Sequence, residues 1–128
     1  MAEFSNYLEN KVLDHVLRNV SYSSPTTVYV GLYTSDPTDA GSGTEVSGGS
    51  YARQALSVTT ASAGIVTSSA DINFPQATAS WGSVGYIGIL DALSSGNLLM
   101  HTVLTTAKTI DTGDILKISS GNLMVTLD

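Results

Sequence analysis

The sequence predicts a mainly β protein: a single antiparallel β-sandwich, jelly-roll-like with about eight strands, preceded by one amphipathic helix. After residue 24, short segments rich in valine, threonine and serine alternate with turns that contain glycine, at intervals of roughly ten residues. Before that point, apolar residues recur at helical spacing. We therefore expect an N-terminal helical arm over residues 1–24 and a β-sandwich over residues 25–128, folded as one unit.

The helix is predicted over residues 5–19. Asn6 and Glu9 stand at capping-box spacing, with Ser5 as a competing N-cap. One face carries an apolar stripe, which consists of Leu8, Val12, Leu13, Val16, Leu17 and Val20. A helix of this length is marginal on its own in water, so the stripe must be buried. It packs either on its own domain or on a neighbouring subunit.

Strands are predicted where apolar residues alternate or run together: 26–33, 51–60, 65–67, 71–74, 81–90, 97–105, 108–111, 115–119 and 123–127. The most apolar segment, 81–90, is the candidate central strand. Its glycines at 82, 85 and 88 indicate bulges or close backbone approach, because no helix follows to make a phosphate-binding loop. Trp81 and Tyr86 are expected to form an aromatic pair in the core.

Residues 34–50 are predicted to form a long exposed loop rich in Asp, Gly, Ser and Pro. Loops of this length are often functional. Asp36, Asp39 and Glu45 could offer oxygens to a calcium ion, although their spacing does not match an EF-hand. A solvated acidic loop without an ion is the commoner arrangement, and the sequence leaves the choice open.

Composition excludes several classes of function. The net charge is −6, and the five basic residues are scattered, which argues against direct binding to nucleic acid or to an anionic membrane. Cysteine is absent, so disulfides and thiolate metal sites are excluded. No segment has the pattern of a membrane span or a secretory signal. Only 12% of residues are charged, and a surface rich in hydroxyl groups favours contact with other protein copies, although many small β-domains have the same composition.

No catalytic constellation is recognisable. His15 and His101 do not belong to a cluster with metal-ligand spacing, and the aspartates between residues 71 and 114 stand at turns or strand ends. No nucleophile-elbow motif accompanies the many serines. We therefore predict that the protein is not an enzyme, with no catalytic, cofactor-binding or metal-binding residues and no cofactor.

Several segments resemble a family of short bacteriophage virion proteins that are often labelled tail-fibre-like. They are the opening at 6–11, the strand and following turn at 26–37, the Gly-Gly-Ser-Tyr-Ala-Arg-Gln run at 48–54, the Ile-Asn-Phe-Pro run at 72–75, Trp-Gly at 81–82, and the closing turns at 113–114 and 121–123. The resemblance covers nearly the whole chain and carries no catalytic motif.

The resemblance implies a non-enzymatic structural component of the virion, assembled in the cytoplasm of the host bacterium. Because the chain is compact and has no internal repeat, the leading interpretation is a capsid decoration (cement) protein that bridges subunits of the major capsid protein. The alternative is a tail-fibre or baseplate-associated protein that contacts the host receptor. A homo-oligomer, preferably a trimer, is expected in either case. The candidate partner-contact residues are Tyr7, Leu8, Val12, Asp36, Pro37, Asp39, Glu45 and Tyr51.

Overall fold

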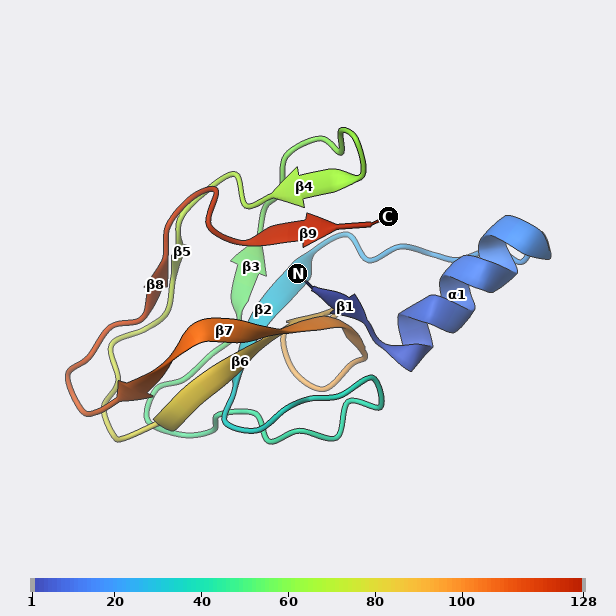
Figure 1. Cartoon of the computed structure of the whole chain (residues 1–128). Helices are drawn as coiled ribbons and strands as arrows, with labels where there is room; N and C mark the ends of the chain where they lie inside the picture. Colours follow the sequence, from blue (N-terminus) through green and yellow to red (C-terminus); the bar gives the residue numbers. More distant parts are fainter. Residues whose placement is uncertain (1, 128) are drawn as a thin grey trace.

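The computed structural model describes residues 2–127, and in this range it has one helix and nine strands (Figure 1). The elements in chain order are β1 (Glu3–Phe4), α1 (Asn6–Leu17), β2 (Val28–Tyr33), β3 (Gln54–Leu56), β4 (Ile65–Thr67), β5 (Ile72–Asn73), β6 (Gly82–Leu90), β7 (Leu98–Ile110), β8 (Lys117–Ile118) and β9 (Met124–Thr126). The mainly β fold with one N-terminal helix is confirmed. The described residues contain no helix that is both long and apolar enough to cross a membrane.

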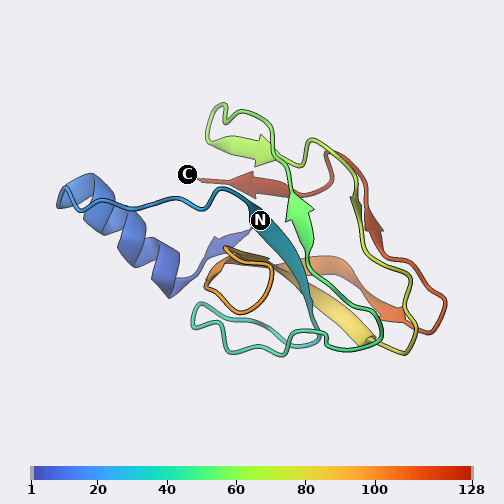
Figure 2. The same cartoon turned by 180° about the vertical axis from the view of Figure 1, so that it is seen from behind.

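Five strands form the main antiparallel sheet, in the order β1-β7-β6-β2-β3. The predicted central strand, β6, lies in the middle of this sheet. Two short antiparallel ladders, β4-β9 and β5-β8, make the rest of the β structure. Apolar side chains from the main sheet and from both ladders share one core cluster, so the ladders act as the second layer of a sandwich (Figures 1 and 2).

The core follows from the register of the central strands. Val30 pairs with Ile89, and Leu32 pairs with Ile87, so the four aliphatic side chains point to the same face of the sheet. Val30 and Leu32 are fully buried, and both isoleucines are nearly so. Burying each such side chain contributes about 1.5–3 kcal/mol relative to leaving it in water.

Two of the three glycines of β6, Gly85 and Gly88, have the predicted structural roles. The β6–β7 register shifts between Val84 and Tyr86, which places an irregularity at Gly85. At Gly88, an added Cβ would lie 2.7 Å from the ring of Tyr33, so only glycine allows this close packing.

Some predicted elements differ from those observed. The segment predicted as a strand over 51–60 is regular only in β3, whereas β7 runs through both 97–105 and 108–111 as one strand. Residues 105–107, Thr-Thr-Ala, contain no turn-forming residue, so the chain does not turn back between the two predicted strands. The β6–β7 register shifts here, with Val84 opposite Lys108 and Tyr86 opposite Val103, so residues 104–107 form a bulge within β7. The prediction of a Trp81–Tyr86 pair was wrong. Trp81 packs edge-on against Tyr51, with ring centroids 5.5 Å apart, because its indole N–H donates to the Gly49 carbonyl at 2.9 Å.

The N terminus is tied to the sheet before the helix begins. β1 pairs with β7, and the side chain of Ala2 is buried in the core. Ser5 is the N-cap of α1: its hydroxyl accepts from the backbone N–H of Leu8 and donates to the carbonyl of Leu98. The helix therefore begins at Asn6 with Ser5 as its N-cap, and Asn6 is not the cap. It ends at Leu17, shortly before Asn19 adopts a left-handed φ of 57°. The expected boundary of the arm at residue 24 stays a prediction.

Candidate functional site

Helix α1 projects away from the sheets in both views (Figures 1 and 2). Leu8 is its buried residue, and Val12 is half-buried. The rest of the predicted stripe is open to solvent, with exposures of 55% for Leu13, 69% for Val16 and 74% for Leu17. Val20, just after the helix, is 43% exposed. The chain itself therefore leaves most of the apolar face of its own helix exposed, and a contiguous face of this kind is typical of an interaction surface.

A second apolar feature lies along the edge of β7. A groove of about 590 Å³ separates residues 102–108 of β7 from the segment that carries β8 and β9. Its apolar walls include Val103, Leu104, Ile118 and Met124. Two of the five basic residues of the chain, Lys108 and Lys117, also line this groove.

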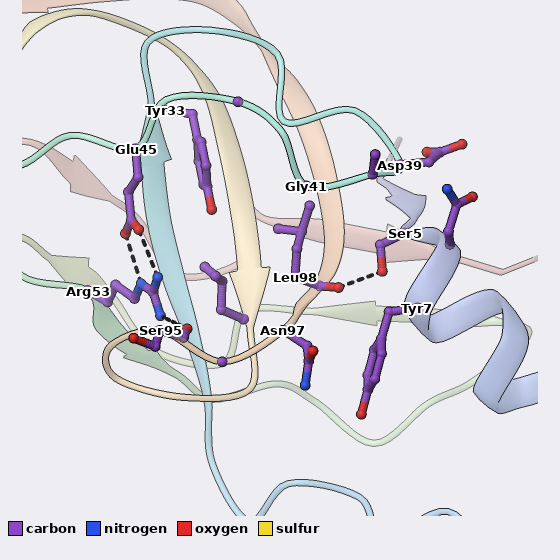
Figure 3. Close-up of a pocket in the computed structure, with 15 residues that line it drawn as sticks. Ser5, Tyr7, Tyr33, Asp39, Gly41, Glu45, Arg53, Ser95, Asn97 and Leu98 are labelled. Atoms are coloured by element: carbon purple, nitrogen blue, oxygen red, sulfur yellow. Dashed lines mark hydrogen bonds and ion pairs between the residues drawn. The ribbon is translucent and has the colours of Figure 1, made fainter.

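A depression of about 610 Å³ lies at the base of the arm (Figure 3). It is enclosed by the start of α1, the loop 34–50 and the β6–β7 connection at 91–97. Tyr7 and Asn97 stand on one side of it, and Glu45 and Arg53 stand on the other (Figure 3).

A hydrogen-bonded network closes the far wall of this depression. The Arg53 guanidinium donates twice to Glu45, with Nε to Oε2 and Nη2 to Oε1 both at 2.8 Å. Its Nη1 donates to the carbonyls of Ala92 and Ser95, also at 2.8 Å. The Tyr51 hydroxyl donates to Glu45 Oε2 at 2.6 Å and accepts from the backbone N–H of Leu32. One arginine thus fixes the loop 34–50 to the β6–β7 connection.

The ionisation of the network is set by these contacts. Burial alone would raise the pKa of Glu45, but hydrogen bonds from Arg53 and Tyr51 outweigh it, so the pKa of Glu45 is lowered. Burial and the neighbouring Glu45 carboxylate raise the pKa of Tyr51. The hydrogen bond to Glu45 raises the pKa of Arg53. At neutral pH the network is therefore a carboxylate–guanidinium pair with a neutral phenol, which is an arrangement for holding loops and not for transferring protons.

The family model described as Podophage GP4 fiber I protein gp80 matches residues 3–126 of the chain. The chain belongs to this family. The predicted resemblance to tail-fibre-like virion proteins is confirmed, and the protein is a structural component of a phage virion. No curated protein matched the chain. The family description favours the tail-fibre alternative over the capsid-decoration interpretation, which is not confirmed.

The eight candidate contact residues divide into four groups in this fibre-family protein. Asp36 and Asp39 are exposed beside His101, where contact with a partner stays a prediction. Tyr7 and Val12 are half-buried on the arm, where contact with a partner stays a prediction. Leu8 and Pro37 are buried in the chain itself and cannot form part of a surface, because the helix start and the loop fold over them. Glu45 and Tyr51 are hydrogen-bonded within the Arg53 network, so their contacts in the structure are to other residues of the same chain.

The loop carboxylates do not gather around one point. Glu45 is bound to Arg53, whereas Asp36 and Asp39 both lie beside His101. A calcium site made by all three is therefore not formed. Within residues 2–127, the donors close enough to share a metal ion belong to Glu3, Asp39 and His101.

Sequence reasoning missed Arg53 and His101. The Tyr-Ala-Arg-Gln run was noticed only as part of the resemblance, and a lone arginine among five basic residues gives no signal of its partner. Glu3 and His101 meet only because β1 pairs with β7, with these two residues directly opposite. Such a contact requires knowledge of the sheet order.

Proposed function

We propose that this chain is a non-enzymatic component of the phage tail fibre and that α1 is the arm by which it assembles. The observation that carries the proposal is the exposed face of Leu13, Val16 and Leu17 on a helix that projects from the sandwich. An isolated helix of this length gains most of its stability from packing, so a partner that covers this face also stabilises the helix. The family description, a fibre protein, supports the fibre location.

The partner that fits the arm best is a second copy of the chain. Its groove beside β7 offers apolar walls, including Val103, Leu104 and Met124, to the apolar stripe. Charge also matches. The groove carries Lys108, and Glu9 lies on the same helix face as Leu13 and Val16. Lys117 in the groove already pairs with Asp71 at 3.3 Å, and Asp14 on the helix already pairs with Arg18 at 2.9 Å. In a chain with net charge −6, Lys108 therefore stands where a second copy would bring the Glu9 carboxylate.

An arm-in-groove contact joins two different surfaces, so it is heterologous and propagates from copy to copy. If the rotation between copies closes, the product is a ring, and a trimer is the expected form. A closed ring of compact domains suits a collar or tip of a fibre better than an extended shaft. Binding of the arm to the major capsid protein is the competing outcome.

Substitution of the stripe tests the proposal without removing β1, which a deletion of residues 1–20 would also remove. Val16→Asp with Leu17→Glu places two charges on the exposed face. Lys11→Glu, which makes the same change in net charge on the opposite face of the helix, is the control. If Val16 and Leu17 are buried in the assembly, losing both side chains removes about 3–6 kcal/mol of association free energy. This loss weakens assembly by at least about a hundredfold.

We expect light scattering after size-exclusion chromatography to give an oligomer for the wild type and the control, and a monomer with an unchanged β circular-dichroism spectrum for the double variant. The double variant should also be missing from purified virions. An oligomer of unchanged mass and normal incorporation of the double variant would contradict the arm's role.

A further inference from the structure

His101 is a buried histidine surrounded by carboxylates from separate segments. Its side chain is 7% exposed, and its Nε2 lies 2.8 Å from Asp39 Oδ1 in the loop 34–50. The same Nε2 lies 3.9 Å from Glu3 Oε2 on β1. Nε2 and one carboxylate oxygen from each of Glu3 and Asp39 lie within 4.8 Å of one another. The fibre role does not use this cluster.

The distances from His101 Nε2 to the two carboxylate oxygens are close to those in a tetrahedral metal site. An ion held at about 2.0–2.1 Å by imidazole and carboxylate donors separates neighbouring donors by roughly 3.3 Å. The two separations at Nε2, 2.8 Å and 3.9 Å, lie on either side of this value. The Glu3 side chain is 72% exposed, so its carboxylate can move by the required fraction of an ångström without disturbing the core.

The backbone around the three donors is already fixed. Glu3 stands directly opposite His101 in the β1–β7 ladder. The carbonyl of Asp39 accepts from the backbone N–H of Asn6 at 2.9 Å, which holds the loop against the start of the arm. Because these elements are held by other hydrogen bonds, an ion would find the donors gathered and would not have to order them.

The other nitrogen of the ring faces a further carboxylate. Asp36 Oδ1 lies 3.9 Å from His101 Nδ1, and the same oxygen accepts from the backbone N–H of Thr38 at 2.9 Å, which orients it. Histidines that bind metals commonly donate their second N–H to a carboxylate, which fixes the tautomer and the ring orientation. At 3.9 Å, Asp36 Oδ1 is beyond hydrogen-bond distance of Nδ1, so it would take this role after a shift of about 1 Å toward the ring.

We propose that Glu3, Asp39 and His101 form a binding site for a divalent transition-metal ion of the Zn²⁺ type, with Asp36 orienting the histidine. The ion takes the place of the proton between Nε2 and Asp39 Oδ1, the neutral ring then carries its one proton on Nδ1, any further proton passes to solvent, and water completes the coordination. An imidazole donor favours Zn²⁺ over Ca²⁺, which prefers oxygen ligands alone. The ion would fasten β1, the loop 34–50 and β7 together at the base of the arm.

The test uses the whole chain, with ZnCl₂ for calorimetric titration and CoCl₂ for absorption spectroscopy. We expect one Zn²⁺ per chain in the wild type, a rise in unfolding temperature on its addition, and the visible absorption bands of tetrahedral Co²⁺. Glu3→Gln and Asp39→Asn each replace a carboxylate ligand with a neutral amide, so the affinity for Zn²⁺ should fall by at least about tenfold. Because the Glu3 side chain is exposed, we expect the Glu3→Gln variant to fold as the wild type does.

His15→Gln is the matched control, because His15 is the other histidine of the chain and is exposed on α1. It should bind Zn²⁺ as the wild type does. Absence of stoichiometric binding in the wild type would overturn the proposal. Equal affinity in Glu3→Gln, Asp39→Asn and the wild type would also overturn it, and so would loss of binding in His15→Gln.

Discussion

Replacing Arg53 with methionine tests how the loops around the depression are held. Methionine preserves the apolar stem of the side chain but cannot donate hydrogen bonds. Glu45 would keep only the Tyr51 hydroxyl as a partner, and the carbonyls of Ala92 and Ser95 would lose their Arg53 donor. The side chain of Arg53 is 9% exposed and that of Glu45 is 23% exposed, so water replaces the lost partners only in part.

The expected loss follows from this burial. Removing one partner of a fully buried ion pair costs about 3–5 kcal/mol, because the other charge is left unpaired. Since Glu45 retains the Tyr51 hydrogen bond and some contact with solvent, we expect the lower end, about 3 kcal/mol. The exposed Arg18–Asp14 pair on α1 is the reference, and Arg18→Met should cost no more than about 0.5 kcal/mol.

Urea unfolding followed by circular dichroism measures both losses. The midpoint for Arg53→Met should fall by roughly 1–2 M, and a cycle with Glu45→Gln should give a coupling energy of about 2 kcal/mol. If Arg53→Met unfolds within about 0.5 kcal/mol of the wild type, as expected for a surface pair, then the network does not hold the loops and the reasoning fails.

Two other predictions concern the same region of the sheet. Because the pKa of Glu45 is lowered in the folded chain, its ionised form stabilises the fold at pH values above its ordinary pKa of 4.5. This stabilisation is lost as the pH falls through the lowered pKa of the folded chain. Unfolding measured at a series of acidic pH values should show this loss of stability in the wild type but not in Glu45→Gln. Gly88→Ala should destabilise the protein by about 1–3 kcal/mol, because the added Cβ would lie 2.7 Å from Tyr33 and 2.8 Å from Leu98. Gly85→Ala is the control and should cost less, because the nearest atom to its added Cβ is 3.9 Å away. Equal unfolding temperatures for the two variants would contradict this prediction.

The parts of the fold set by local pattern were predictable from the sequence. The spacing of Leu8, Val12 and Val16 predicted the helix, and the apolar run after Trp81 predicted the central strand. The helix cap was less certain, because Ser5 and Asn6 are both good caps. The hydrogen bond from Ser5 to Leu98, which selects Ser5, depends on the tertiary fold.

The parts set by distant contacts were not predictable. Periodicity indicates that α1 has an apolar face but not what covers it, and the structure leaves most of that face exposed. The Trp81–Tyr86 pairing failed because Trp81 turns toward Tyr51, while Tyr86 packs in a separate cluster with Tyr33, Leu90 and Leu98. The Arg53 and His101 clusters join segments far apart in the chain, and no spacing along the sequence records them.

The most direct test of the fibre assignment is immunogold electron microscopy of purified virions with an antibody against this chain. The fibre proposal predicts gold confined to the tail, at or beside the fibres. Gold spread over the head would contradict it and would restore the capsid-decoration interpretation, with the major capsid protein as the partner of the arm.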